Sequence, residues 1–481
     1  MATITSAGLG SGLDVSTIVS KLTELERTPI TQLQREASTI QSKISSFGSL
    51  TSAVSSLKDA AAKLNQASTW SATTATSADA SAVAVSTDSN AATGNYSVAV
   101  QSLAMGQTTA SATYASSGAT IGIGTLTFDI GTYGAGQSTF TTNPNWPRAT
   151  VEITAADNSL EKVRDKINSA GVGVVASVVT DATGSRLVFR SALTGAANAF
   201  KVSATDGDGN DTDGAGLSAL AYDPTLSITN MASMQPAANA KLTINNLPVE
   251  SATNTVTGAV EGLTLKLNKV TSSPVDVGVT QDTESIKKAI TGFTTAYTNL
   301  NSLIKDQTKY DATTKKAGTL QGDSAAISIQ SRMRAILSQT SGASSVYGQL
   351  SQIGISIDAN GALSVSSSKL DGALSANLGE VKKLFSNLDT ANTANNGFAQ
   401  RFTDLASEVT SFEGTLSTRT SGLQKRLSDN TKRQAELEDR VALFQARLTK
   451  QYNSLDTTMS NLNGLSTYVS QQIAAMNKSN T

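Results

Sequence analysis

Apolar side chains recur every three or four positions through the C-terminal stretch 397–476. This heptad spacing predicts one long helix whose apolar stripe must be covered by a partner helix. Its first part is Phe402, Leu405, Val409, Phe412, Leu416, Arg419 and Leu423. After a slip of one residue it continues as Leu427, Asn430, Gln434, Leu437, Val441, Phe444, Leu448, Gln451, Leu455, Thr458 and Leu462. The length of the run and its polar members favour a coiled coil or bundle over an ordinary helical hairpin.

The N-terminal region has the same spacing and can supply the partner. A short helix is expected to begin near Val15, capped by Asp14 or Ser16, and Pro29 separates it from a longer one. The apolar face of the short helix is Val15, Ile18, Leu22 and Leu25. The seam of the longer one is Leu33, Ala37, Ile40, Ile44, Phe47, Leu50, Val54, Leu57, Ala61 and Leu64. Both chain ends would therefore pack together, with the middle of the chain inserted as a lobe.

The middle of the chain changes to the alternation that is typical of strands. The predicted strands are 82–86, 96–100, 125–130, 149–154, 172–180, 185–190, 241–244, 253–256 and 263–267. Asp157 or Asn158 can cap a short helix that carries Leu160, Val163 and Ile167. No proline follows Pro274, which favours helices in the remainder.

Two further helices and a hairpin are predicted in the region without proline. One helix starts at Asp282 or Thr283, and Asp323 caps the next. Their inward positions are Ile286, Ala289, Ile290, Phe293, Tyr297, Leu300, Ile304, Ile329, Met333 and Ile336. A hairpin joins 353–357 to 362–365.

These patterns predict an α+β multidomain protein. A discontinuous helical coiled coil or bundle, formed by both chain ends, would carry an inserted β-rich head of two small domains. We expect a flexible coiled-coil leg at 1–42, a bundle helix at 43–70, the head at 71–280 with an inner subdomain at about 150–230, the bundle at 281–425, and a C-terminal leg at 426–481 that pairs with the N-terminal one. The extreme ends are expected to order only in an assembly.

Composition removes whole classes of function. Lys and Arg number 37 and Asp and Glu 38, so there is no basic excess for nucleic acid or an anionic membrane. Cysteine and histidine are both absent, which excludes disulfides and every site that needs a thiol or imidazole. No signal peptide is expected in residues 1–28, and no apolar run is long enough to insert into a membrane.

No segment carries the pattern of a catalytic, cofactor or metal site. The glycines of 8–12 lack the preceding strand and following lysine of a phosphate loop. The acidic loop 206–216 has Asp211 where a calcium loop needs glycine and Leu217 where it needs glutamate, so we interpret it as a solvated turn. We predict that the protein is not an enzyme and needs no cofactor.

Trp146 lies between two prolines in the turn-rich segment 131–148. Such a side chain can be a half-buried anchor for its loop or an exposed contact of the head with a partner. Both interpretations remain open from the sequence.

The opening 7–15 (AGLGSGLDV) and the segment 455–463 (LDTTMSNLN) are specific motifs, one near each end of the chain. They resemble the flagellar filament cap family, the hook-associated protein 2 proteins. The run 160–168 with the hairpin after it resembles the inserted β motif that flagellins and hook-associated proteins share, and 244–265 resembles a second copy with Asn246 where glycine is frequent. The segments 353–365 and 381–385 are similar to the helical domain of the family.

The resemblance implies an extracellular protein at the flagellum tip, exported without a cleaved signal peptide. It would form a homo-oligomeric ring, expected to be a pentamer, that retains flagellin and promotes its folding and polymerisation, as filament elongation and motility require. Its implied partners are itself, flagellin, the hook–filament junction protein and an export chaperone. Candidate contacts with filament or subunits are Leu9, Leu13, Ile18, Leu22, Leu455, Met459 and Leu462, and Trp146 is the candidate exposed contact of the head.

Two other functions stay open. The chain could be another axial protein, a junction protein or a flagellin, which would also pair its terminal helices; the GLGSGLD opening at 8–14 favours the cap. It could also be a flagellar surface adhesin that uses the region 109–146 for cell adhesion, and such a role is compatible with capping.

Overall fold

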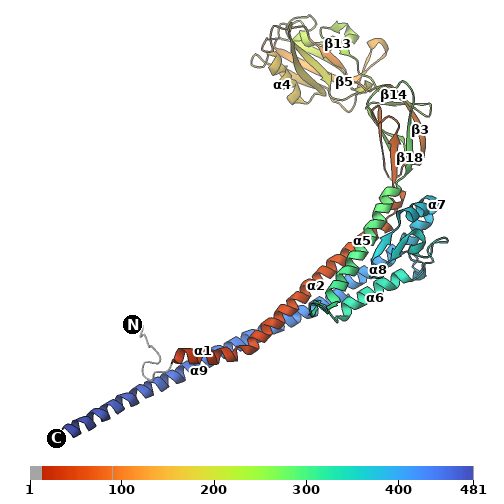
Figure 1. Cartoon of the computed structure of the whole chain (residues 1–481). Helices are drawn as coiled ribbons and strands as arrows, with labels where there is room; N and C mark the ends of the chain where they lie inside the picture. Colours follow the sequence, from red (N-terminus) through yellow and green to blue (C-terminus); the bar gives the residue numbers. More distant parts are fainter. Residues whose placement is uncertain (1–13, 89, 480–481) are drawn as a thin grey trace. The chain divides into compact units, whose positions relative to one another are not determined.

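The structure is a computed structural model that describes residues 14–88 and 90–479. The chain forms two compact units: a helical unit from the residues up to Trp70 and from Thr283 onward, and a β unit from Ser71 to Asp282. The helical unit is thus built from both chain ends, and Figure 1 shows α2 beside α9 within it. The expected α+β organisation, with a β-rich insertion between helical ends, is confirmed.

The helical unit contains long helices and two short hairpins. Its elements are α1 (Val15–Glu26), α2 (Thr28–Asn65), α3 (Ala67–Ser71), α5 (Thr283–Thr308), β19 (Tyr310–Asp311), β20 (Lys316–Ala317), α6 (Ser324–Ser338), β21 (Ile355–Ile357), β22 (Leu363–Val365), α7 (Ser367–Ser386), α8 (Phe398–Thr410) and α9 (Thr415–Ser479). Two predicted caps are confirmed: Asp14 accepts a hydrogen bond from the Thr17 amide and Asp323 from the Ala325 amide, both at 3.0 Å. Pro29 lies in the first turn of α2, where its missing N–H costs nothing.

The core of the helical unit joins α2, α5, α7 and α8. Every inward position predicted on α5 is buried, from Ile286 to Ile304. The ring of Phe402 on α8 meets Phe293 and Tyr297 of α5 edge-on, with ring centroids 5.3 and 5.7 Å apart. These contacts connect segments far apart in sequence, so the seams of the two chain ends are covered by one shared core.

The predicted single helix across 397–476 is wrong at one place. α8 ends at Thr410 and α9 begins at Thr415, separated by a tight turn in which the Gly414 amide donates to the carbonyl oxygen of Ser411 at 2.9 Å. A Cβ on Gly414 would lie 2.4 Å from the carbonyl oxygen of Glu408, so only glycine fits there. The turn rotates Phe412 out of the seam, and its side chain is 95% exposed. By contrast, α9 is continuous where the apolar spacing shifts by one residue after Leu423. The expected leg boundaries at 42–43 and 425–426 fall inside α2 and α9.

The first core of the β unit lies between two sheets. Its strands are β1 (Thr73–Ser77), β2 (Val83–Thr87), β3 (Gly94–Ser102), β14 (Ala240–Ile244), β15 (Leu247–Ser251), β16 (Thr255–Val260), β17 (Leu263–Leu267) and β18 (Val275–Gln281). The sheet orders are β1-β18-β3-β14-β15 and β16-β17-β2, all antiparallel. Inward alternate residues such as Val98, Leu242 and Val277 fill the core, as the period-two pattern predicts.

The second core of the β unit is inserted between β3 and β14. Its elements are β4 (Thr108–Ala110), β5 (Gly124–Tyr133), β6 (Phe140–Thr142), β7 (Ala149–Ile153), α4 (Leu160–Ala170), β8 (Val174–Asp181), β9 (Gly184–Ser191), β10 (Ala199–Asp206), β11 (Tyr222–Asp223), β12 (Ile228–Thr229) and β13 (Ala232–Gln235). One sheet has the order β12-β11-β10-β5-β6, with β7 also on β5, and the other has the order β13-β4-β9-β8.

The expected lower bound of this inner subdomain, about 150, is too high. β5 pairs with both β10 and β7, and its residues Leu126 and Phe128 are at most 1% exposed in the same core as α4. The segment 131–148 is also not all loop, because it holds the end of β5 and all of β6. Local alternation marks strands but does not tell which strands pair, so the boundary could not be placed from the pattern.

The hairpin predicted after α4 is confirmed as β8 and β9, whose register runs from Val174 opposite Ser191 to Asp181 opposite Gly184. Ser159 precedes α4 as its cap residue, in place of the expected Asp157 or Asn158. Asp157 instead forms an ion pair with Lys166 at 2.7 Å. Asn168 on α4 bonds both backbone groups of Ala176 on β8, at 2.8 and 2.9 Å, and so fastens the helix to the sheet edge.

Candidate functional site

The terminal helices α1, α2 and α9 hold most of the predicted contact residues. α1 packs on α9 with Val15, Val19 and Thr23, which are all buried. The expected apolar face is therefore only partly right: Ile18 is half-buried, whereas Leu22 and Leu25 are 37% and 71% exposed. The buried positions recur every fourth residue, so the helix presents a face rotated from the one that spacing suggested. Leu9 and Leu13 lie outside the described residues.

A polar layer lies inside the pairing of α2 with α9. Asn430 is 6% exposed, and its Oδ1 accepts a hydrogen bond from Nε2 of Gln434 at 2.5 Å. Glu36 of α2 accepts from Arg426 at 3.1 Å and from Asn430 at 3.5 Å. A buried asparagine in a helical seam specifies register at some cost in stability, because slipping the helices would leave it unsatisfied. The polar seam residue Asn430 thus helps to set the register of α2 against α9 and does not interrupt their pairing.

Beyond the region that α1 contacts, α9 keeps an apolar stripe that is largely exposed. Of the predicted contacts, Leu455 and Leu462 are 45% and 54% exposed and Met459 is half-buried. The stripe continues through Leu465, Val469 and Ile473. The seam predicted from the sequence ends at Leu462, although its heptad spacing continues from Thr458 to Leu465 and from Leu462 to Val469. The spacing itself would have shown this register.

Trp146 is half-buried and packs on the second core of the β unit. A Cβ on Gly173 would lie 3.1 Å from the ring of Trp146, and Gly173 has a φ of +78°. Glycine is therefore needed at position 173 for both space and backbone conformation. This packing matches the interpretation of Trp146 as a half-buried anchor for its loop. The ring covers the protein's own core, and a contact of Trp146 with a partner stays a prediction.

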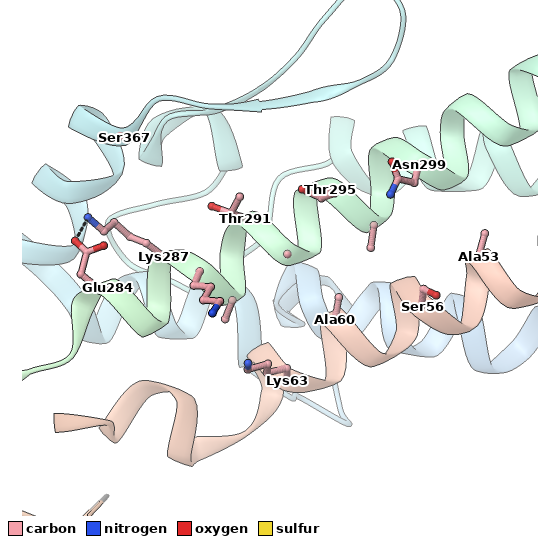
Figure 2. A pocket seen from close by; sticks show the side chains of 14 residues that line it. Ala53, Ser56, Ala60, Lys63, Glu284, Lys287, Thr291, Thr295, Asn299 and Ser367 are labelled. Carbon is pink, nitrogen blue, oxygen red and sulfur yellow. Dashed lines mark ion pairs between the residues drawn. The ribbon is translucent and has the colours of Figure 1, made fainter. Parts of the chain in front are cut away.

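A groove of about 970 Å³ runs between α2 and α5 on the helical unit. Figure 2 shows Ala53 and Ala60 of α2 along one wall and Thr291 and Thr295 of α5 along the other. The groove is lined by Ala53, Ser56, Ala60, Lys63, Glu284, Lys287, Lys288, Ala289, Thr291, Gly292, Thr295, Ala296, Asn299 and Ser367. Most of these side chains are small, so the two helices leave an open channel over the core.

Lysines gather at one end of the groove. Figure 2 shows Lys63 and Lys287 at the end opposite Ala53. Lys287 pairs with Glu284 and, at 2.9 Å, with Asp371, and its hydrogen bond to Glu284 is the main cause that raises the pKa of its ammonium. Lys288 and Lys63 are exposed and form no ion pair within 14–88 and 90–479. One end of the groove therefore carries uncompensated positive charge.

The acidic loop after β10 closes on itself. Asp206 accepts from the Ser218 amide at 2.6 Å, and the Asp206 amide donates to Asp211 at 2.8 Å. No group of three or more acidic side chains with metal-binding geometry occurs among the residues that the structure describes. In that same part of the chain, none of the helices combines the length and apolarity needed to cross a bilayer.

Comparison with known proteins assigns the chain to a family. Models of the N-terminus and C-terminus of flagellar hook-associated protein 2 match residues 11–107 and 237–464. A flagellar hook-associated protein 2 from Escherichia coli (strain K12) is 34% identical over 98% of both chains. The chain belongs to the flagellar hook-associated protein 2 family. A B-type flagellar hook-associated protein 2 from Pseudomonas aeruginosa is 30% identical over 98% of both chains.

Two further findings fit hook-associated protein 2. The crystal structure of the D1-D2-D3 domains of the flagellar cap protein FliD from Escherichia coli aligns with a TM-score of 0.63 at 31% identity, covering 79% of this chain and 99% of that one. The flagellin hook IN motif matches residues 133–192, which confirms the β motif predicted around α4 and the β8–β9 hairpin. The family resemblance seen in the terminal motifs is confirmed as well.

Proposed function

We propose that this chain caps the distal end of a bacterial flagellar filament, outside the cell. In this proposal several copies form a ring, with five as the expected number, that retains exported flagellin and promotes its folding and polymerisation. The observation that carries the proposal is the match over nearly the whole chain to hook-associated protein 2 relatives, together with the likeness to a solved flagellar cap protein. Contacts with the hook–filament junction protein and with an export chaperone before secretion are part of the same proposal.

The terminal helices offer a physical reason for such a role. Leu455 and Leu462 on α9, and Leu22 on α1, are apolar side chains left at least 37% exposed in the single chain. Burying one leucine side chain contributes roughly 1.5–3 kcal/mol, so a partner that covers several of them gains substantial binding energy. We propose that Ile18, Leu22, Leu455, Met459 and Leu462 contact neighbouring subunits or filament proteins. Leu9 and Leu13 are proposed for the same surface from their sequence alone.

Deletion of the gene tests the proposal. Loss of the cap is expected to release flagellin into the medium as monomer and to leave filaments missing or stunted, as seen by electron microscopy and swimming assays. Re-expression of the unaltered chain should restore both. Filaments of normal length in the deletion strain would overturn the proposed function.

A pair of variants links that outcome to the α9 stripe. The double variant Leu455→Asp, Leu462→Asp should fail to complement the deletion, because charge on the stripe opposes its burial. Leu443→Asp is the matched control: Leu443 is 73% exposed on the same helix and outside the stripe, so this variant should complement. Circular dichroism of both purified variants checks that the helices remain folded.

Export without a cleaved signal peptide is the remaining part of the proposal. The protein recovered from filaments should have the intact mass of the full sequence, apart from its initiator methionine. A mass that lacks an N-terminal segment would reject this part alone.

A further inference from the structure

The turn between α8 and α9 presents an aromatic side chain to solvent in a fixed position. Phe412 is 95% exposed, and the turn around it is held by amide-to-carbonyl bonds from Ser411 to Glu408 at 3.3 Å and from Gly414 to Ser411 at 2.9 Å. Aromatic side chains dominate the binding energy of protein interfaces when they enter a pocket on the partner. An exposed phenylalanine on such a turn therefore has the form of an interface anchor.

The charge beside this anchor is negative. Glu413 follows Phe412 directly, is exposed, and forms no ion pair within the described parts of the chain. Glu408, one turn earlier on α8, is already paired with Arg332 through both carboxylate oxygens. Glu413 is thus the carboxylate left available to a partner.

The α2–α5 groove has the complementary shape and charge. Its floor is apolar and made of small side chains, among them Ala60, Ala289 and Ala296, and its volume of about 970 Å³ leaves room for a phenyl ring. At one end stand Lys63 and Lys288, exposed and without ion pairs in the described residues. Phe412 does not fill this groove within its own chain, because a residue that is 95% exposed is covered by nothing.

We propose that Phe412 of one copy inserts into the α2–α5 groove of the next copy, with Glu413 beside Lys63 and Lys288. The occupant is a second copy because the anchor and the groove occur on the same unit with opposite charge. Two different patches that meet head to tail generate a closed ring when the rotation between copies closes. This contact rests on the proposed ring-forming function and specifies which surfaces of the helical unit would build it.

Self-association of the full chain measures the contribution of the anchor. Phe412→Ala should weaken the association constant, followed by analytical ultracentrifugation, by about 10- to 100-fold, the range for loss of an aromatic anchor. Gly292→Leu should weaken it similarly by filling the groove, and no atom lies within 4 Å of a Cβ at Gly292 to disturb the fold. Leu443→Ala removes an apolar side chain of comparable exposure from α9 and should leave association unchanged.

Charge reversal tests the pairing directly. Glu413→Lys and Lys288→Glu should each weaken association, and the chain that carries both should associate more strongly than either. The chain has no cysteine of its own, so introduced thiols report contacts without background. A mixture of Phe412→Cys and Gly292→Cys proteins should form a mixed disulfide-linked dimer on mild oxidation.

The results separate this contact from the proposed function. If wild-type and Phe412→Ala chains form the same oligomer and the thiol mixture yields no mixed dimer, the contact is wrong while capping stands. Cross-linking of Phe412→Cys to flagellin, in place of a second copy, would also overturn it. A wild-type chain that remains monomeric at all concentrations would reject both the contact and the ring.

Discussion

Asp323 connects the start of α6 to α9 and has two measurable roles. Its Oδ1 accepts from the Ala325 amide at 3.0 Å, and its Oδ2 accepts from Nε and Nη2 of Arg419 at 3.0 and 2.7 Å. The Asp323 side chain is 2% exposed and that of Arg419 is 44% exposed. Arg419, the charged member of the apolar seam, is thus held by a carboxylate from another helix.

Replacement of Asp323 by alanine removes both roles. Loss of a helix cap costs about 1 kcal/mol. We assign about 1–2 kcal/mol to the ion pair, discounted because the half-exposed Arg419 regains water when its partner is removed. Asp323→Ala should therefore lower the unfolding free energy of the helical unit by about 2–3 kcal/mol. Asp323→Asn keeps a good capping residue and should lose only the part due to the ion pair, about 1–2 kcal/mol.

The two tryptophans allow the helical unit to be followed alone. Trp70 is 4% exposed in the helical unit and stacks on Phe385 with centroids 5.9 Å apart, whereas Trp146 lies in the β unit. In a Trp146→Phe background, guanidinium unfolding followed by fluorescence reports the environment of Trp70. Asp323→Asn and Arg419→Met then form a double-mutant cycle for the pair.

Two results would refute this reasoning. An alanine variant as stable as the asparagine variant would show that the cap contributes nothing. A coupling energy below about 0.3 kcal/mol in the cycle would show that the ion pair is energetically neutral despite its geometry.

Further outcomes follow from packing and charge. Gly414→Ala should destabilise the helical unit by more than about 2 kcal/mol, because the new Cβ would meet backbone atoms. Gly422→Ala should stabilise α9 by up to about 1 kcal/mol, because no atom lies within 4 Å of a Cβ there. Denaturant titration measures both changes. In a Trp70→Phe background, which leaves Trp146 to report on the β unit, Phe189→Ala in the second β core should cost about 3–5 kcal/mol, read from the shift in unfolding midpoint. Hydrogen bonding, first to Lys383, lowers the pKa of Glu380 from 4.5 to about 2. A carboxyl group whose pKa is lowered by folding stabilises the fold above pH 4.5, and this contribution is lost as the pH falls toward 2. Glu380→Gln should remove that part of the acid dependence when stability is measured as a function of pH.

The candidate surface was only partly readable from the sequence. Leu455 and Leu462 were predicted as contacts from the family resemblance, and the structure leaves both about half exposed. Phe412 was predicted to share the seam with Val409, which is buried, although Gly414 two residues later is a local signal for a turn. The α2–α5 groove has no sequence signature, because the absence of large side chains at a helix crossing depends on which helices cross.

The sequence by itself determined which residues can be buried and in which kind of element. Apolar spacing of three and four along α5 follows from the geometry of a helix, so its inward positions were correct without any knowledge of neighbours. Only the tertiary structure decided what covers each face. The rotation of α1 onto α9 and the choice of strands that pair with β5 depend on contacts between distant segments. Local spacing carries no information about those contacts, because their free energy comes from the shape of the partner surface.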